Sequence, residues 1–506
     1  MKRLILLIIT VIPMLLLNAQ DITDGLRYSI DDLNGSARFN ALSGAFGSLG
    51  GDLTAMTINP AGSAIFLNNF SSASFSVSDI KNDASYFNST SGTSDSDINV
   101  NQAGVVFVFT NSNEESSWKK FSIGINYNSM KNYDDELLVN GTGNTSIGEF
   151  FLVQAQGIPL ELLQLQNGET VSDLYSYLGE TQGTKTQNAF LGYQAFLFDP
   201  LFPEDPENTQ YISNIAPGNF NHEYIYVSKG FKGKYTINFA SQITDNFYFG
   251  INLNTYSIDY DQGTYLYESN SNQGSLVNKV GFENNLYVVG NGFSTQIGAI
   301  AKLAESFRVG ITYDSPTWLS ISEETYQNLE SERTIDDQVI NEFIDPRVIN
   351  VFEEYDLRTP GKLSASAAYI FGKHGLLSFD YSYKDFSNIK FSPSNDPHFI
   401  SLNNAIENSY QGASSYRIGG EYRLNTVNLR GGYLYKESPY KDETIMGDLN
   451  GFSLGAGINL GDYAFDFSYS RTQQDRMHQM YTIGLTDSAM IESTTNNFVF
   501  TINYNL

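Results

Sequence analysis

The residues that decide the fold are 247–254, which read FYFGINLN. The odd positions, from Phe247 to Leu253, are aromatic or aliphatic, whereas the even positions carry Tyr, Gly, Asn and Asn. A period of two residues is typical of a strand whose two faces meet different surroundings. An apolar face opposite a largely small and polar face predicts a strand that meets lipid on one side and a polar lumen on the other.

The same alternation recurs along the chain. Residues 121–127, 377–383 and 463–469 each carry aromatic or aliphatic side chains at every second position. The C-terminal segment from Phe498 to Leu506 does the same up to the last residue. This recurrence predicts an all-β protein, a transmembrane antiparallel β-barrel.

Short and long connections alternate between the expected strands. Turn-forming residues predict tight connections at 244–246, 304–306, 372–375, 425–426 and 461–462. Long polar connections are expected near 81–100, 133–221, 262–284, 323–351, 391–412, 438–449 and 472–492. Periplasmic turns and extracellular loops give a barrel this asymmetry, and counting from Ile65 gives about 14 strands. A secreted β-sandwich is the alternative, although it would not need the asymmetry.

Composition excludes several classes of function. The chain has 506 residues, with 29 basic and 56 acidic side chains, a net charge of −27, no cysteine and 4 histidines. Nucleic-acid binding needs a basic surface, so no nucleic-acid partner is expected. Without cysteine there is no disulfide framework, thiolate metal site or cysteine nucleophile. No Ser/His/acid set can be named, and we predict no catalytic residue, no metal site, no cofactor and no enzyme activity.

The N-terminus predicts export. Met1-Lys2-Arg3 precedes an apolar run from Leu4 to Leu17, and the small residue Ala19 follows. A basic start, a short apolar stretch and a small residue are typical of a signal peptide, here residues 1–19. No later run reaches the roughly 18 apolar residues of a transmembrane helix. We therefore expect a multi-pass protein of a Gram-negative outer membrane, in contact with lipid and lipopolysaccharide.

Residues 20–63 do not alternate and precede the expected barrel at 64–506. Their glycines, Gly44, Gly47, Gly50 and Gly51, permit close backbone approach and positive φ angles. A phosphate-binding loop is the alternative, but no Gly-Lys-Ser/Thr follows. We predict a compact hatch that fills the lumen.

The hatch segment carries a family resemblance. Residues 45–62 read AFGSLGGDLTAMTINPAG, with an acid at Asp52 and the triplet Asn59-Pro60-Ala61. This run resembles the hatch signature of FadL-type outer-membrane transporters of hydrophobic compounds. Residues 355–369, 379–388 and 429–439 are similar to later strands of that family, so the resemblance spans nearly the whole mature chain.

The resemblance implies a monomeric barrel of 14 strands with an N-terminal hatch. It also implies passive uptake in which extracellular loops capture a hydrophobic ligand, the hatch moves, and the ligand leaves sideways through a break in the third strand. By position, Asn59, Pro60 and Ala61 are the hatch residues, and the third strand is the one around 121–127. Gly124 is the expected weak point of that strand.

The long loop at 133–221 is unusually apolar for a loop. Two interpretations remain open: short helices bury these residues against each other over the barrel mouth, or the residues line a groove for a fatty or aromatic ligand. The candidate ligand-binding residues are Phe150, Phe151, Leu160, Leu163, Phe190, Tyr193, Phe196 and Phe198.

Charged residues fall on the expected lumen side of several strands. They are Asp380, Lys384, Arg417, Glu421, Arg430 and Asp466. They could pair across strands inside a narrow polar interior. They could instead dock the hatch or line a passage.

The leading hypothesis is uptake of a hydrophobic small molecule, with long-chain fatty acids first and aromatic hydrocarbons as another ligand class. A haem receptor is a variant, for which His222 and His398 lie near predicted loops. A barrel scaffold for surface-protein secretion or attachment is the alternative from another class. Acidic loops such as 134–136 fit either case and could bind calcium weakly.

Overall fold

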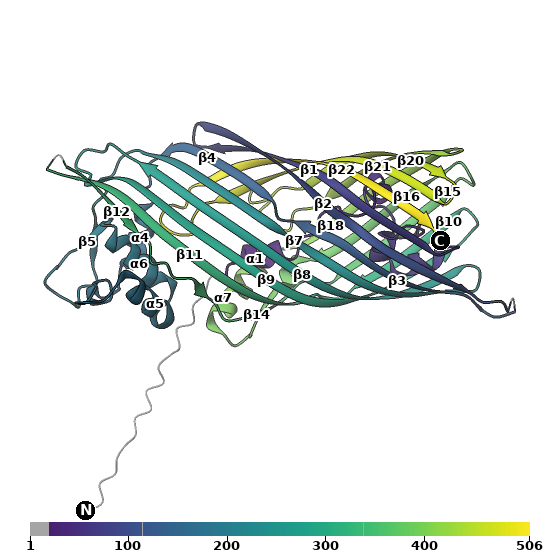
Figure 1. The fold of residues 1–506 in the computed structure, drawn as a ribbon, viewed down its shortest axis with the longest axis horizontal. Helices are drawn as coiled ribbons and strands as arrows, with labels where there is room; N and C mark the ends of the chain where they lie inside the picture. The colour runs from purple at the N-terminus through teal and green to yellow at the C-terminus, as the bar shows by residue number, and fades with distance from the viewer. Residues whose placement is uncertain (1–19, 114, 337) are drawn as a thin grey trace, which may run out of the picture.

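The structure is a computed structural model that describes residues 20–113, 115–336 and 338–506. The expected signal peptide at 1–19 lies outside the described residues. Strand β1 (Phe70–Tyr86) pairs antiparallel with β2 (Ser89–Thr110) on one side and with β22 (Ser488–Asn505) on the other. Because the first and last strands pair, the sheet closes into a barrel (Figure 1).

The wall makes 14 antiparallel passes, which confirms the predicted fold. The third pass is β3 (Trp118–Asn132) continued by β4 (Asp135–Gly143), and the seventh is β10 (Phe307–Asp314) continued by β11 (Trp318–Ile335). The eighth is assembled from β12 (Gln338–Ile344), β13 (Asn350–Val351), β14 (Tyr355–Arg358) and β15 (Lys362–Ile370). The others are β7 (Phe220–Ile243), β8 (Phe247–Ser269), β9 (Val277–Lys302), β16 (Gly375–Asp385), β18 (Gly412–Leu424), β19 (Val427–Lys436), β20 (Leu449–Leu460) and β21 (Tyr463–Gln479).

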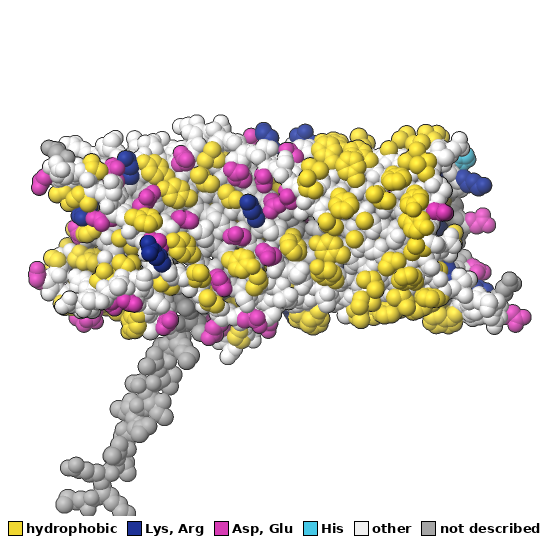
Figure 2. All heavy atoms as spheres, viewed as in Figure 1, with side chains coloured by type: hydrophobic (Ala, Val, Ile, Leu, Met, Phe, Trp, Pro, Cys, Tyr) yellow, Lys and Arg dark blue, Asp and Glu magenta, His cyan; other side chains and the backbone are white. Residues whose placement is uncertain are grey.

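The apolar belt covers only half of the barrel's length. The side chains of Phe247, Phe249 and Leu253 are exposed on the outer wall, as the alternation predicts. Figure 2 shows apolar side chains gathered on the right-hand half, where the short turns lie, and acidic side chains over the left-hand half. The membrane therefore surrounds the periplasmic half, and the other half projects outside the cell.

The strands run further than the sequence predicts. Residues expected in long loops at 81–100, 262–284, 323–351 and 472–492 are mostly strand, and β8 pairs with β9 without interruption from Phe247 to Ser269. The loop expected at 133–221 likewise begins with β4. The predicted boundaries were wrong because a strand beyond the membrane is polar on its outer face and loses the apolar alternation.

Residues 144–219 form a helical lid at the extracellular end (Figure 1). The lid consists of α4 (Gly148–Ala155), η2 (Leu160–Leu162), α5 (Val171–Gln182), α6 (Thr184–Gln194), β5 (Phe198–Pro200) and β6 (Tyr211–Ser213). Thr170 and Asp173 form a capping box that begins α5. The lid packs its apolar side against the inner wall, where the rings of Phe151 and Phe282 lie 5.0 Å apart. None of the described helices is long and apolar enough to cross a membrane.

A second helical excursion follows β16. It contains η3 (Phe386–Asn388), β17 (Lys390–Ser392) and α7 (Pro397–Ser409). Asp396 caps α7 by accepting hydrogen bonds from the amides of His398 and Phe399, and Pro397 occupies the first helical position.

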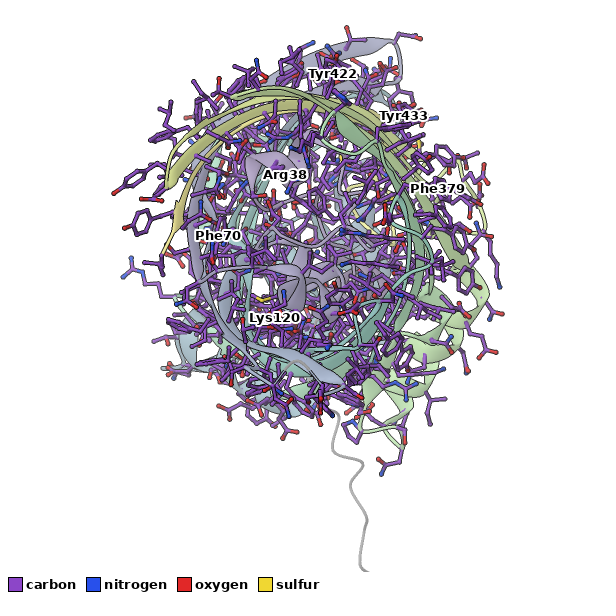
Figure 3. All side chains as sticks on the ribbon, turned by 90° about the vertical axis from the view of Figure 1, so that its right-hand side faces the viewer. Arg38, Phe70, Lys120, Phe379, Tyr422 and Tyr433 are labelled. Atoms are coloured by element: carbon purple, nitrogen blue, oxygen red, sulfur yellow. The ribbon has the colours of Figure 1, made fainter. Side chains whose placement is uncertain are left out.

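Residues 20–66 lie inside the lumen. They form α1 (Ile22–Arg27), α2 (Ala37–Ala41), α3 (Ala55–Ile58) and η1 (Pro60–Ile65). Figure 3 looks along the barrel from the end with the short turns: Arg38 lies within the ring of strands, whereas Phe379 lies on its outer side. We call residues 36–66 the hatch core, and residues 20–34, which extend toward the extracellular half, the N-terminal arm.

Candidate functional site

Asn59 fixes the hatch core to the wall. Its side-chain amide nitrogen donates to the carbonyl of Gly47, 2.7 Å away, and to the carbonyl of Ala299 in β9, 3.1 Å away. Its side-chain oxygen accepts a hydrogen bond from the amide of Ala61 and thereby caps η1, in which Pro60 is the first residue. One buried side chain thus joins two parts of the hatch to a wall strand.

The wall is hollowed where the hatch core touches it. A Cβ atom added to Gly250 would lie 2.4 Å from the carbonyl carbon of Pro60, and one added to Gly310 would lie 2.4 Å from the carbonyl oxygen of Gly47. The other wall glycines in this position are Gly124, Gly298, Gly419, Gly432 and Gly455. The sequence analysis named Gly124 only as a weak point of the third strand, and it missed the contacts of all these glycines with the hatch, although their signal was present as glycine at inward positions of alternating strands.

An ion-pair chain joins the hatch core to three wall strands. Glu421 lies 2.8 Å from the guanidinium of Arg38 in the hatch and 2.8 Å from that of Arg430. Arg430 also contacts Asp466, 2.5 Å away. Separately, Asp380 accepts hydrogen bonds from the amides of Phe46 and Gly47. Among the predicted lumen charges, Glu421, Arg430 and Asp466 therefore pair across strands, and Glu421 and Asp380 dock the hatch.

The remaining predicted hatch residues shape the core itself. Gly44, Gly50 and Gly51 have φ angles of 78°, 63° and 68°, in the left-handed region that favours glycine. Asp52 is buried and accepts hydrogen bonds from the hydroxyl of Ser36 and the amide of Thr54. Burial raises the pKa of Asp52 above its ordinary value, although Arg38 opposes this.

A cavity of about 1040 Å³ lies above the hatch core. Its floor includes the N-terminal arm, and Phe150 of the lid reaches it from the extracellular side. Aromatic side chains follow one another along this side: the ring of Phe150 lies 4.8 Å from that of Tyr481, and the ring of Tyr224 lies 5.4 Å from that of His478. The hydroxyl groups of Tyr226 and Tyr260 are 3.0 Å apart.

Basic side chains gather at the lower end of the same cavity. The cations that line it there are Lys131, Lys234, Lys362, Lys384, Arg417 and Lys436. Lys234 is only 6% exposed and has no hydrogen-bonding partner among the described residues. The cavity is therefore aromatic at one end, and at the other end lysine and arginine outnumber the carboxylates of Asp31 and Asp32, in a chain whose net charge is −27.

The wall is unpaired on one side of this cavity. Main-chain pairing between β2 and β3 stops at Gln102 and Asn128. Beyond that point β2 pairs only with β1, and β4 pairs only with β7. Side chains make the contact between β2 and β4 instead, as where the hydroxyl of Thr93 donates to the carbonyl of Glu136, 2.5 Å away. The cavity reaches both edges of this wall gap, at Asn101 and at residues 128–135.

Comparison with known proteins identifies the family. The family described as outer membrane protein transport protein (OMPP1/FadL/TodX) matches residues 232–506. The chain belongs to this family. The FadL/TodX family transports hydrophobic compounds across the outer membrane of Gram-negative bacteria, and the protein is an outer-membrane protein of this kind. Members of the family are transport channels rather than enzymes.

Solved structures share the fold of the FadL/TodX chain described here. A FadL homologue of Pseudomonas aeruginosa is 11% identical with a TM-score of 0.54, and the match covers 94% of this chain and 99% of that one. The toluene transporter TodX of Pseudomonas putida is 15% identical with a TM-score of 0.51, over the same shares of the two chains. No curated protein matches the sequence. At these identities the likeness concerns the fold.

Gly124 lies below the wall gap of this FadL/TodX barrel. It pairs with Val106 in β2 and Asn238 in β7, and an added Cβ would lie 2.5 Å from the sulfur of Met56 in the hatch. The unpaired stretch begins beyond Asn128 on the same strand. The third strand thus contains both Gly124 and the start of the wall gap. A role for Gly124 in lateral exit stays a prediction.

The candidate ligand residues of the long loop fall into three groups. Phe150 lines the cavity. Phe196 lies under the guanidinium of Arg333, 3.7 Å from ring centre to Cζ, and Tyr193 is partly buried at the edge of the lid. The fully or nearly fully buried members fill the core of the lid: Phe151, Leu160, Leu163, Phe190 and Phe198. Their contact with a ligand stays a prediction that requires the lid core to open.

The two histidines considered for haem, His222 and His398, do not line the cavity. His222 is buried between Glu268, 3.0 Å away, and the hydroxyl of Tyr86, 3.2 Å away. Glu268 also accepts hydrogen bonds from the hydroxyl of Ser146 and the amide of Ile147, at the start of the lid. These hydrogen bonds attach the start of the lid to the wall. Within the described ranges, no three His, Cys, Asp or Glu side chains are grouped so as to hold a metal ion.

Proposed function

We propose that the protein takes up long-chain fatty acids through the outer membrane by passive transport. The supporting observation is the cavity, which presents aromatic rings at one end and lysine and arginine at the other. A fatty acid has a hydrocarbon tail for the first and a carboxylate for the second. Buried lysines are costly unless an anion accompanies them, and Lys234 has no hydrogen-bonding partner among the described residues, so a neutral hydrocarbon would leave its charge without one.

The proposed route begins at the lid and ends at the wall gap. The lid captures the ligand at the extracellular end, and Phe150 passes it to the cavity. Movement of the N-terminal arm then exposes the gap between Asn101 and residues 128–135. The paired rings of Tyr127 and Tyr235, 5.1 Å apart, lie on the outer wall just below the gap, as aromatic residues do at the edge of a membrane belt. The ligand would therefore leave sideways into the outer leaflet, and the barrel would act as a monomer surrounded by lipid and lipopolysaccharide.

Removal of one cavity lysine tests the choice of substrate. Lys234→Met keeps the length of the side chain and removes its charge. A hydrogen bond to a charged group contributes about 1.5–3 kcal/mol, so we expect oleate uptake to fall about tenfold or more. Uptake of toluene should stay unchanged. Labelled oleate and toluene would be measured in cells that lack other transporters of this class.

Lys279→Met is the matched control because Lys279 lies on the outer surface, paired with Glu332. Its uptake of both compounds should equal that of the unmodified protein. Equal oleate uptake by the Lys234 variant, or a parallel loss of toluene uptake, would contradict the fatty-acid proposal.

A further inference from the structure

The N-terminal arm is held to the wall by lysines of three different strands. Lys384 donates to the carbonyl of Ser29, 2.6 Å away, and Lys436 donates to the carbonyl of Asp31, 2.9 Å away. Lys232 donates to a carboxylate oxygen of Asp31, also 2.9 Å away. These lysines come from β16, β19 and β7, so residues 29–31 are attached to the wall on several sides.

Asp32 attaches the next residue of the arm to the edge of the wall gap. Its carboxylate accepts hydrogen bonds from Lys131, 2.7 Å away, and from the amide of Asn132, 3.2 Å away. Its own amide donates to the carbonyl of Met130, 2.8 Å away. Residues 130–132 belong to the part of β3 that has lost its pairing with β2. The arm therefore braces the free edge of the third strand.

The cluster contains more cations than these aspartates neutralise. Lys234 faces the cavity without a hydrogen-bonding partner among the described residues, and the Nε of Arg417 has none either. Lys362 forms an ion pair with the carboxylate of Asp314, 2.8 Å away. A buried excess of positive charge favours the entry of a further anion.

Asp31 remains ionised in this setting. Burial alone would raise the pKa of Asp31, but Lys232 and Lys384 outweigh burial and hold that pKa well below its ordinary value. The arm thus supplies the cavity with a permanent carboxylate in the place where a ligand's carboxylate would bind.

We propose that the carboxylate of an incoming hydrophobic acid replaces Asp31 and Asp32 on these lysines and thereby releases the N-terminal arm from the wall. The inference rests on the proposed function, because it requires an acidic ligand. A ligand shifts a conformational equilibrium only by binding one state more tightly than the other. In the released state the lysines are free to bind a carboxylate, so a ligand with a carboxylate binds this state more tightly. A neutral molecule has no such preference for the released state.

The exchange couples ligand binding to lateral exit. Release of Asp32 removes the brace on residues 130–132, and the free edge of β3 can then move away from β2. The hatch core stays in place, because Asn59, Asp380 and the wall glycines hold it independently of the arm.

The absence of cysteine permits a direct test on the full-length protein in detergent. Ser29→Cys introduces one thiol at a position that is 1% exposed, so a maleimide reacts with it only when the arm leaves the wall. We expect oleate to accelerate the reaction at least tenfold and oleyl alcohol, which has the same chain without the charge, to leave it unchanged. Calorimetry on the same samples measures whether each compound binds.

Two further variants separate arm release from a change of charge. Asp31→Asn in the Ser29→Cys background should react rapidly without ligand, and so should Asp32→Asn, because each removes a carboxylate that holds the arm to a wall lysine. Asp314→Asn is the matched control: it removes a carboxylate of the same cluster that belongs to the wall, and it should react slowly. Slow reaction of both arm variants, or fast reaction of the Asp314 variant, would overturn the proposal.

The ligand experiments distinguish this proposal from the proposed function. Oleate that binds without accelerating the reaction would overturn the exchange and leave fatty-acid uptake standing. Oleate that does not bind would overturn both. Equal acceleration by oleyl alcohol would show that the carboxylate is not what releases the arm.

Discussion

The side-chain oxygen of Asn59 occupies the space that a side chain on Gly298 would need. A Cβ atom at Gly298 would lie 2.2 Å from that oxygen, a distance at which one of the two groups must move. Asn59 belongs to the hatch and Gly298 to the wall strand β9. The hatch and the wall therefore fit each other at the level of single atoms. A substitution in the wall should disturb the hatch, and this can be measured.

Gly298→Ala should unseat the hatch core while the barrel still forms. An additional methyl group in a packed interior costs about 1–3 kcal/mol, and here it displaces the side chain that joins hatch to wall. We expect higher ion conductance through single barrels in planar lipid bilayers. Gly431→Ala is the control, because its nearest atoms lie 3.6 Å away, in ordinary contact. Conductance equal to that of the unmodified protein would show that the hatch tolerates the change.

Glu421→Gln should destabilise the protein strongly. The substitution leaves the guanidinium groups of Arg38 and Arg430 without their shared carboxylate, and removal of one partner from a buried ion pair costs about 3–5 kcal/mol. Urea unfolding in lipid vesicles measures this loss. Asp83→Asn removes a carboxylate from the exposed pair with Lys81 and should change stability by less than about 1 kcal/mol. Similar losses in both variants would refute a special contribution of Glu421.

Docking of α1 should weaken as pH rises from about 4 to 7. Burial raises the pKa of Asp24 to about 7 from an ordinary value of 3.8, and the neighbouring Asp21 and Glu323 act in the same direction while Arg27 opposes them. Because the docked state binds a proton more tightly than the free state, docking is strongest below both pKa values. It weakens between them and is constant above the higher one.

Hydrogen exchange of the α1 amides at pH 5 and pH 8 measures this effect. Exchange should be faster at pH 8 after correction for the intrinsic rate. Asp24→Asn has no titrating group at this position, so its protection should be the same at both pH values. A pH dependence that survives in the variant would assign the effect to another residue.

A reversible cross-link across the wall gap should block uptake. Thr93 of β2 contacts the backbone of Glu136 in β4, so cysteines at these positions can be joined by a short reducible dithiol linker. Uptake of oleate should stop after linking and return after reduction. Cysteines at Thr142 and Asn221, whose side chains are hydrogen-bonded between the paired strands β4 and β7, provide the control. If linking the first pair left uptake intact, exit through this gap would be excluded.

The sequence predicted the elements whose physics is local. In the membrane belt, residues such as Phe249 and Asn252 must face lipid and lumen in turn, and the resulting period of two identified the strands and their number. The short turns at 244–246 and 425–426 followed from their turn-forming residues. The same signal disappears beyond the membrane, which is why the outer halves of β8 and β9 were expected to be loops.

The cavity could not be predicted from the sequence, for a different reason. Lys131, Lys232, Lys384 and Lys436 lie on different strands, far apart in the sequence, and none stands in a motif. Their meeting around Asp31 and Asp32 depends on the register of the strands, on closure of the barrel and on the path of the N-terminal arm. The sequence by itself determined that this chain builds a lipid-facing barrel around a hatch, because lipid imposes a repeating local pattern. Only the tertiary structure decided which of the lumen charges contact one another, because that proximity arises from pairing between distant strands.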